Sequence, residues 1–196
     1  MNTSDQITAI VDGVEQSIPA NSTGFTLFAE KTVVALRVNG ELKDLAFSVT
    51  AGDVVEPVHI SSPDGLNILR HSAAHVLAQA VQTLNPEAKL GIGPPIKDGF
   101  YYDFDVDKPF TPEDLRALEK EMDRIIRSGQ RFLRRVTNDE AATAELANEP
   151  YKLELIGLKS GTQDVGEASA EVGAGDLTIY DNYDVKAEQV VWKDLC

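Results

Sequence analysis

The chain has little cysteine and no long apolar run, and both shortages limit where it can work. Of its 196 residues only Cys196 is a cysteine, so no disulfide can form within the chain and a reducing compartment is expected. No apolar run approaches the roughly 20 residues that cross a bilayer, and the first residues lack the basic and apolar regions of a secretory signal. The sequence therefore predicts a cytoplasmic protein with no membrane partner.

Positive charge is also scarce. The chain carries 18 Lys and Arg against 32 Asp and Glu, for a formal net charge of −14. This balance opposes unspecific attraction to nucleic acids or anionic membranes, so a polyanionic partner must meet a local basic patch. With 42% hydrophobic residues the chain can bury one substantial core or two small ones, and we expect two domains.

The first 60 residues carry mainly strand patterns. Apolar and polar residues alternate on both sides of Asp12-Gly13, which predicts a hairpin because Asp-Gly favours a tight turn. Three more elements are expected, a short helix at 23–30 and strands at 32–38 and 54–60. This order predicts a compact α+β module of β-grasp type over residues 1–62.

Residues 63–196 are expected to form a second α+β domain. A helix at 66–84 should end before Pro86, because proline disfavours helical geometry in the residue before it. A further helix is expected at 137–147, with strands at 89–92, 99–105, 131–136, 177–180 and 190–196. Glycine, serine, alanine and acids dominate 160–175, which predicts a surface insertion.

A basic row follows the expected start of another helix at Thr111, which Gly129 should close. Its members recur at spacings of three or four and are Arg116, Lys120, Arg124, Arg127 and Arg131. If the helix extends far enough, they form either a solvated face beside acidic neighbours or a row that faces phosphates.

Two of the three histidines, His71 and His75, lie four residues apart on the expected helix and share a face. The apolar stripe points the other way and comprises Leu66, Leu69, Ala73, Val76, Leu77, Ala80 and Leu84. Core packing is therefore not expected to explain the pair. Such histidines can be ordinary surface residues, activate water and orient substrate, or bind a metal with Cys196, a better third ligand than His59.

Several motifs together resemble the amino-terminal half of bacterial threonyl-tRNA synthetases. They are RHSAAH at 70–75, GIGPP at 91–95, GFYYD at 99–103 and KDLC at 193–196. VNGELKDL at 38–45 likewise resembles the TGS domain that precedes the editing domain in this family. The resemblance implies a β-grasp TGS domain at 1–62 and, at 63–196, an α+β editing domain with an antiparallel sheet that lacks its C-terminal side.

The resemblance implies hydrolysis of seryl-tRNA(Thr) made in error. Serine lacks one methyl group of threonine, which discriminates by only about 1–3 kcal/mol, so a second site is needed. Ligation of threonine to tRNA would belong to an absent class II core that holds ATP with Mg and zinc, and this fragment would need no cofactor. The parent would be a homodimer and the fragment monomeric. The natural chain is expected to continue past Cys196 into Arg-Gly-Pro-His, whose histidine completes the family's site.

The resemblance also implies roles for individual residues. His71 and His75 would contact the terminal adenosine or position water, and Cys196 would line the same pocket without a metal. Lys152 would meet developing negative charge or transfer a proton. Two further residues would bind substrate, Tyr102 by shaping the pocket and Asp194 by attracting the serine ammonium.

Other interpretations stay open from the residues alone. Lys152 can be an exposed helix lysine, Tyr102 half-buried packing and Asp194 a strand-edge carboxylate. The whole chain can be a non-catalytic TGS-type module that binds RNA or protein. It can also be a free-standing metal-dependent aminoacyl-tRNA hydrolase that uses the histidine pair and Cys196.

Overall fold

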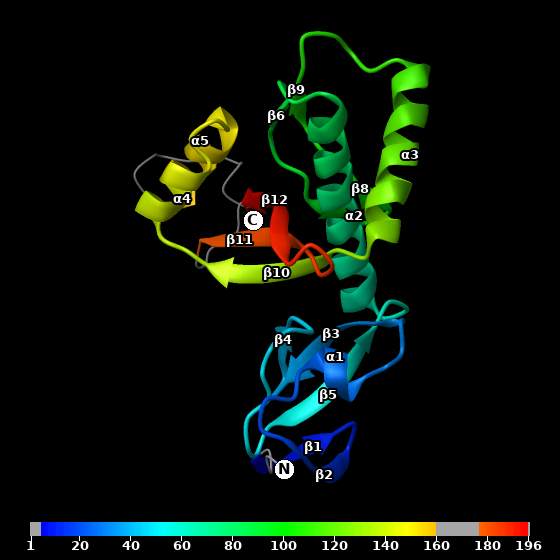
Figure 1. The fold of residues 1–196 in the computed structure, drawn as a ribbon, viewed down its shortest axis with the longest axis vertical. Coiled ribbons are helices and arrows are strands. Elements are labelled where there is room, and N and C mark those ends of the chain that lie inside the picture. The colour runs from blue at the N-terminus through cyan, green and yellow to red at the C-terminus, as the bar shows by residue number, and fades with distance from the viewer. Residues whose placement is uncertain (1–4, 160–176, 196) are drawn as a thin grey trace. The chain divides into compact units, whose positions relative to one another are not determined.

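The computed structural model describes residues 5–159 and 177–195 and divides into two compact units, Met1–Arg70 and His71–Cys196 (Figure 1). The division falls inside helix α2 (Pro63–Leu84), so the domain assignment at 1–62 and 63–196 stays a prediction. The predicted insertion at 160–175 lies outside the described residues. Within those residues, no helix has both the length and the apolar character that a membrane span requires.

The first unit is a five-stranded sheet with one short helix. Its elements are β1 (Gln6–Val11), β2 (Val14–Pro19), α1 (Gly24–Leu27), β3 (Val33–Val38), β4 (Glu41–Lys43) and β5 (Val54–His59). The strand order is β2-β1-β5-β3-β4, in which β1 and β5 are parallel and the other pairs antiparallel. The predicted hairpin is confirmed, since Asp12 and Gly13 have φ of 49° and 76° between paired strands.

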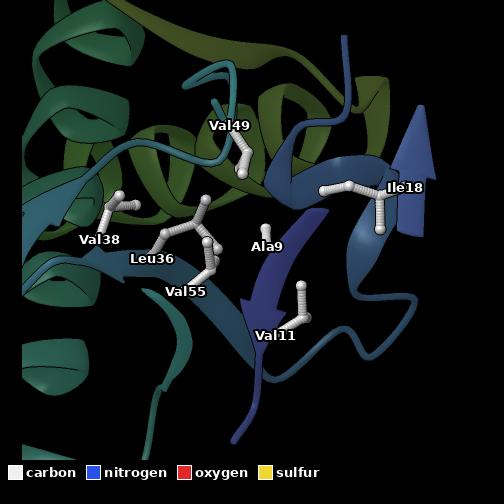
Figure 2. Close-up of a cluster of buried hydrophobic side chains, with 7 residues drawn as sticks. All are labelled: Ala9, Val11, Ile18, Leu36, Val38, Val49 and Val55. Atoms are coloured by element: carbon white, nitrogen blue, oxygen red, sulfur yellow. The ribbon is translucent and has the colours of Figure 1, made fainter. Parts of the chain in front are cut away.

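The core of the first unit comes mainly from strand residues, with Val49 added from the segment before β5. Its buried residues are Ala9, Val11, Ile18, Leu36, Val38, Val49 and Val55 (Figure 2). The helix expected at 23–30 is only one turn long, and β4 was not predicted at all.

The second unit contains a three-stranded sheet, two short strand pairs and four helices of the described chain. The sheet comprises β10 (Arg131–Val136), β11 (Thr178–Asp184) and β12 (Gln189–Leu195), drawn from yellow-green to red in Figure 1. The helices besides α2 are α3 (Pro112–Ser128), α4 (Asp139–Glu145) and α5 (Pro150–Lys159). The short strands are β6 (Lys89–Leu90) paired with β9 (Phe104–Asp105), and β7 (Pro95–Ile96) paired with β8 (Gly99–Phe100).

The two faces of the three-stranded sheet have different partners. On one face Ile179 and Leu195 lie opposite each other and bury with residues of α4 and α5. On the other face Tyr180 lies opposite Asp194, and both turn toward α2, as the ring of Tyr180 beside His75 indicates. The mixed α+β class with antiparallel sheets is thus confirmed.

Helix α2 is covered on two sides, which changes the expected exposure of its residues. Its apolar stripe packs against α3 through contacts of Val76, Ala80 and Val81 with Leu118 and Ile125. Its histidine face meets the sheet, so the interpretation of the pair as ordinary surface residues is wrong for His75, which is 4% exposed. The most exposed members of the predicted stripe are Leu66, Leu69 and Leu84, at 39–50%.

Helix α3 begins and ends where the sequence predicts. Thr111 caps it with a reciprocal box, and Gly129 closes it with a φ of 73°. Arg131 starts β10 instead of continuing the helix, so the basic row ends at Arg127. The three arginines of the row on α3 pair with carboxylates of their own helix, as Arg124 does with Glu121, which favours a solvated face over a phosphate-facing row.

Candidate functional site

A buried carboxylate, that of Asp194 on β12, gathers side chains from three other parts of the second unit. Asp194 is 2% exposed. Its Oδ1 forms an ion pair with Lys152 Nζ of α5 and accepts a hydrogen bond from the backbone N–H of Leu195, each at 2.8 Å. Its Oδ2 accepts from the hydroxyl of Tyr102 at 2.7 Å and lies 3.5 Å from His75 Nδ1. Three other predicted site residues, Lys152, Tyr102 and His75, therefore meet around the charge of Asp194.

The ammonium of Lys152 pairs with one carboxylate and donates two hydrogen bonds. Besides Asp194, Nζ lies 3.3 Å from the hydroxyl oxygen of Tyr102 and 3.4 Å from the carbonyl oxygen of Leu195. The side chain is 3% exposed, so its interpretation as an exposed helix lysine is wrong. Burial of a cation is costly unless it is paired and hydrogen-bonded, and this geometry provides both.

Tyr102 lies between β8 and β9, where a glycine gives its ring space. A Cβ atom on Gly93 would lie 2.1 Å from Cδ2 of Tyr102, far inside van der Waals contact. The ring stacks on Phe104 with centroids 4.8 Å apart and an interplanar angle of 16°. The GIGPP and GFYYD motifs thus meet in space, and together they fix the direction of the Tyr102 hydroxyl.

The two histidines lie against each other on α2. Their Nε2 atoms are 3.2 Å apart, and Tyr180 lies beside both rings, with centroids 6.2 Å from His71 and 5.6 Å from His75. Burial lowers the pKa of His75 to about 4, against the opposing effect of the Asp194 charge. Burial also lowers the pKa of the half-buried His71, so both imidazoles are neutral near pH 7.

The surroundings of the pair favour one arrangement of its protons. His75 Nδ1 lies 3.5 Å from Asp194 Oδ2, a contact too long for a good hydrogen bond, and because a carboxylate only accepts, we assign the single N–H of neutral His75 to Nδ1. Nε2 of His75 then accepts from Nε2–H of His71, and the lone pair of His71 falls on Nδ1. Asp194, His75 and His71 form a row in which the first two orient the third, and His71 Nδ1 can take up a proton.

A second polar layer continues the histidine face of α2. Gln79 accepts a hydrogen bond from Asn182 Nδ2 at 2.8 Å, and Gln82 accepts one from Trp192 Nε1 at 2.8 Å. Gln82 also donates to Glu149 at 2.7 Å. Our sequence analysis missed this layer, although glutamines four and seven positions after His75 are a readable signal, because they prolong a polar stripe on one helix face.

An ion-pair cluster ties the opposite face of the sheet to α4. Arg135 Nε lies 2.7 Å from Asp181, and its Nη2 lies 2.6 Å from Glu145. Lys193 Nζ also lies 2.8 Å from Glu145. Hydrogen bonds from Arg135 and then Lys193 lower the pKa of Glu145 to about 2. The cluster fixes β12 two residues from its end, next to Asp194.

Neither of the two proposed third metal ligands is placed beside His71 and His75 within the described residues. Cys196 lies outside them, and His59 belongs to the first unit, where its Nδ1 is 3.2 Å from Thr32 Oγ1. Among residues 5–159 and 177–195, no group of three or more His, Cys, Asp or Glu side chains forms a potential metal site.

The chain is similar in sequence to several curated bacterial proteins. No protein-family model matches it. It is 71% identical over 177 residues to the threonine–tRNA ligase of Leifsonia xyli subsp. xyli, covering 88% of this chain and 26% of that protein. It is 66% identical over 183 residues to that of Streptomyces avermitilis, with coverage of 93% and 28%. For Paenarthrobacter aurescens the match is 60% over 198 residues, with coverage of 100% and 30%.

The chain spans 26 to 30% of the length of these curated relatives. The matched segments cover 88 to 100% of this chain. The resemblance to bacterial threonyl-tRNA synthetases is therefore confirmed, and the chain is closely similar to just over a quarter of such an enzyme.

Proposed function

We propose that the chain is the amino-terminal part of a threonine–tRNA ligase, and that its second unit contributes an editing site that hydrolyses seryl-tRNA(Thr). The observation that carries the proposal is the convergence of His75, Tyr102 and Lys152 on the buried Asp194, beside His71. Buried charge, a neutral imidazole pair and a tyrosine hydroxyl at one place suit proton transfer more than structural support.

The reaction is attack of water on the ester that joins serine to the terminal ribose. His71 Nδ1 takes a proton from the water, and the resulting imidazolium is stabilised by His75 and the charge of Asp194. The hydroxide adds to the carbonyl carbon, whose oxygen gains the negative charge. The C–O bond to the ribose then breaks while His71 returns the proton to the ribose oxygen. The products are free serine and tRNA.

The other residues supply charge and shape. The buried ammonium of Lys152 and the hydroxyl of Tyr102 provide positive potential for the developing oxyanion, in a place where water screens it little. Asp194 attracts the serine ammonium through its charge. Cys196, which lies outside the described residues, is predicted to line the same pocket.

The same proposal covers the domain types, the rest of the enzyme, its location and its oligomeric state. The order β2-β1-β5-β3-β4 with a parallel central pair supports a β-grasp TGS domain before the editing domain. The rest of the enzyme would ligate threonine with ATP and Mg and hold zinc. The full enzyme would act on tRNA in the cytoplasm as a homodimer, while the 196-residue chain would be monomeric in light scattering.

The test is deacylation of seryl-tRNA(Thr) by the full-length enzyme and its His71→Ala and His75→Ala variants. We expect each variant to lose at least a hundredfold in rate, in the range that general acid–base groups contribute. Threonylation of tRNA by the same preparations serves as the control and should stay unchanged. Equal deacylation rates in all three proteins would reject the editing site and favour a module that only binds. Loss of wild-type deacylation on removal of a stoichiometric metal would favour the metal-dependent hydrolase.

A further inference from the structure

One exposed cation stands on the same face of the sheet as the histidine pair. Arg134 of β10 lies directly opposite Tyr180 of β11, whose ring flanks both histidines. Directly opposed residues of antiparallel strands point to the same face, with Cβ atoms about 5 Å apart. Phe132, two residues earlier on β10, supports this placement, because its ring centroid lies 6.1 Å from that of His75.

Arg134 differs from its neighbours in having no partner for its charge. Within the described residues, it takes part in no hydrogen bond or ion pair, and it is exposed. The adjacent Arg135 is held by Asp181 and Glu145, and Lys152 is held by Asp194. Within residues 5–159 and 177–195, Arg135 and Lys152 are thus neutralised by carboxylates, whereas the guanidinium of Arg134 is not.

An available guanidinium is significant in a chain with a net charge of −14. Such a chain repels a polyanion over most of its surface, so productive binding depends on local cations. Guanidinium groups match the geometry of phosphate oxygens and bind them through paired N–H donors. A ligand whose reacting ester lies at His71 and whose phosphate lies one nucleotide unit away would meet Arg134 at the edge of the site.

We propose that Arg134 binds a phosphate of the RNA 3′ end while the esterified ribose lies at His71. This rests on the proposed editing function and adds a binding residue to it. Arg134 touches the non-reacting part of the substrate. Its contribution is expected in substrate binding and not in the chemical step.

The test compares two substrates in the full-length enzyme, seryl-tRNA(Thr) and the seryl ester of adenosine, which has no phosphate. We expect Arg134→Gln to raise KM for seryl-tRNA about tenfold, with a salt dependence reduced by about one phosphate contact, and to leave hydrolysis of seryl-adenosine unchanged. Lys186→Gln is the matched control. It removes the same charge from the exposed β11–β12 turn and should change neither substrate's KM.

Each other outcome overturns the proposal. An equal loss on both substrates would mean that Arg134 acts on the fold of the site, and no loss on either would mean that no phosphate binds there. Equal effects of the two variants would assign the change to net charge. Failure of the editing function is recognised separately, because His71→Ala would then leave seryl-adenosine hydrolysis unchanged whatever Arg134→Gln does. Arg134→Lys should restore part of the affinity, since it keeps the charge but not the paired donors.

Discussion

Lys152 Nζ and Asp194 Oδ1 form an ion pair of 2.8 Å in which each side chain is 3% exposed. The pair joins α5 to the end of β12. Residues 160–176, which the structure does not describe, lie between the two partners in the sequence. Burial of the pair makes it a sensitive point, because removal of one partner leaves the other charge without compensation.

We first predict that Asp194→Asn and Lys152→Met each destabilise the chain by about 3–5 kcal/mol, because each leaves one buried charge unpaired. The double variant should be more stable than the sum of the two single costs suggests, since it removes both charges. Urea unfolding of the 196-residue chain measures all three values. Additive costs, or single costs below about 1 kcal/mol, would show that the pair is not coupled as the geometry indicates.

The second prediction concerns stability and pH. The pKa of His75 is lowered from 6.5 to about 4, so between these values the unfolded chain binds a proton that the folded chain does not. The stabilisation is complete above pH 6.5 and is lost as the pH falls toward 4, by an amount on the order of 3 kcal/mol. His71, whose pKa is also lowered by burial, adds in the same direction.

Urea unfolding at several pH values checks this prediction in the parent chain and one variant. His75→Gln should flatten the dependence of the unfolding free energy on pH between 6.5 and 4. Glu145 titrates in a separate window, because its lowered pKa removes stability only as the pH falls from 4.5 toward 2. A wild-type chain with constant stability between pH 6.5 and 4 would contradict the buried, neutral state of His75.

The third prediction concerns Gly93, which touches no charge of the site. A methyl group there would lie 2.1 Å from the ring of Tyr102, so Gly93→Ala must displace the ring and break its hydrogen bond to Asp194. We expect a loss of about 1–3 kcal/mol in stability from overpacking, and a fall in seryl-tRNA deacylation. In a Tyr102→Phe background, the further fall in activity should be small, because the hydroxyl is already gone. Independent, multiplying losses would show that Gly93 acts elsewhere.

The fourth prediction uses the single tryptophan of the chain as a reporter. Gln82→Leu removes the acceptor of Trp192 Nε1–H and the donor to Glu149, which we expect to cost about 1–3 kcal/mol. The emission of Trp192 should shift, and the thermal midpoint should fall. Gln16→Leu on the exposed strand β2 is the control and should stay within about 0.5 kcal/mol of the parent chain. Unchanged emission in Gln82→Leu would show that Trp192 does not depend on this bond.

Local signals in the sequence predicted local structure well. Asp12-Gly13 predicted its hairpin, and Thr111 with Gly129 predicted both ends of α3, because turns and caps are decided by a few adjacent residues. The single strand expected at 99–105 is instead two short strands, β8 and β9, with different partners, since short strand pairs depend on neighbours beyond the local pattern.

The candidate site shows what a single sequence cannot provide. Helical periodicity placed His71 and His75 on one face, but it did not indicate that a sheet covers that face and buries His75. That cover comes from β11 and β12, more than a hundred positions along the chain. The family resemblance named Lys152, Tyr102 and Asp194 as site residues, and their burial and mutual distances came only with the fold.

The buried carboxylate of Asp194 already accepts two hydrogen bonds, from Leu195 N–H and the Tyr102 hydroxyl, and its negative charge is paired with the ammonium of Lys152. A ligand cation that approaches Asp194 must therefore compete with the ammonium of Lys152, which carries the same charge. The affinity of Asp194 for a ligand ammonium depends on the difference between its interaction with that group and its interaction with Lys152. It does not depend only on the cost of moving the ligand ammonium out of water. A ligand ammonium that bound to Asp194 would displace Lys152 from its ion pair in the same step.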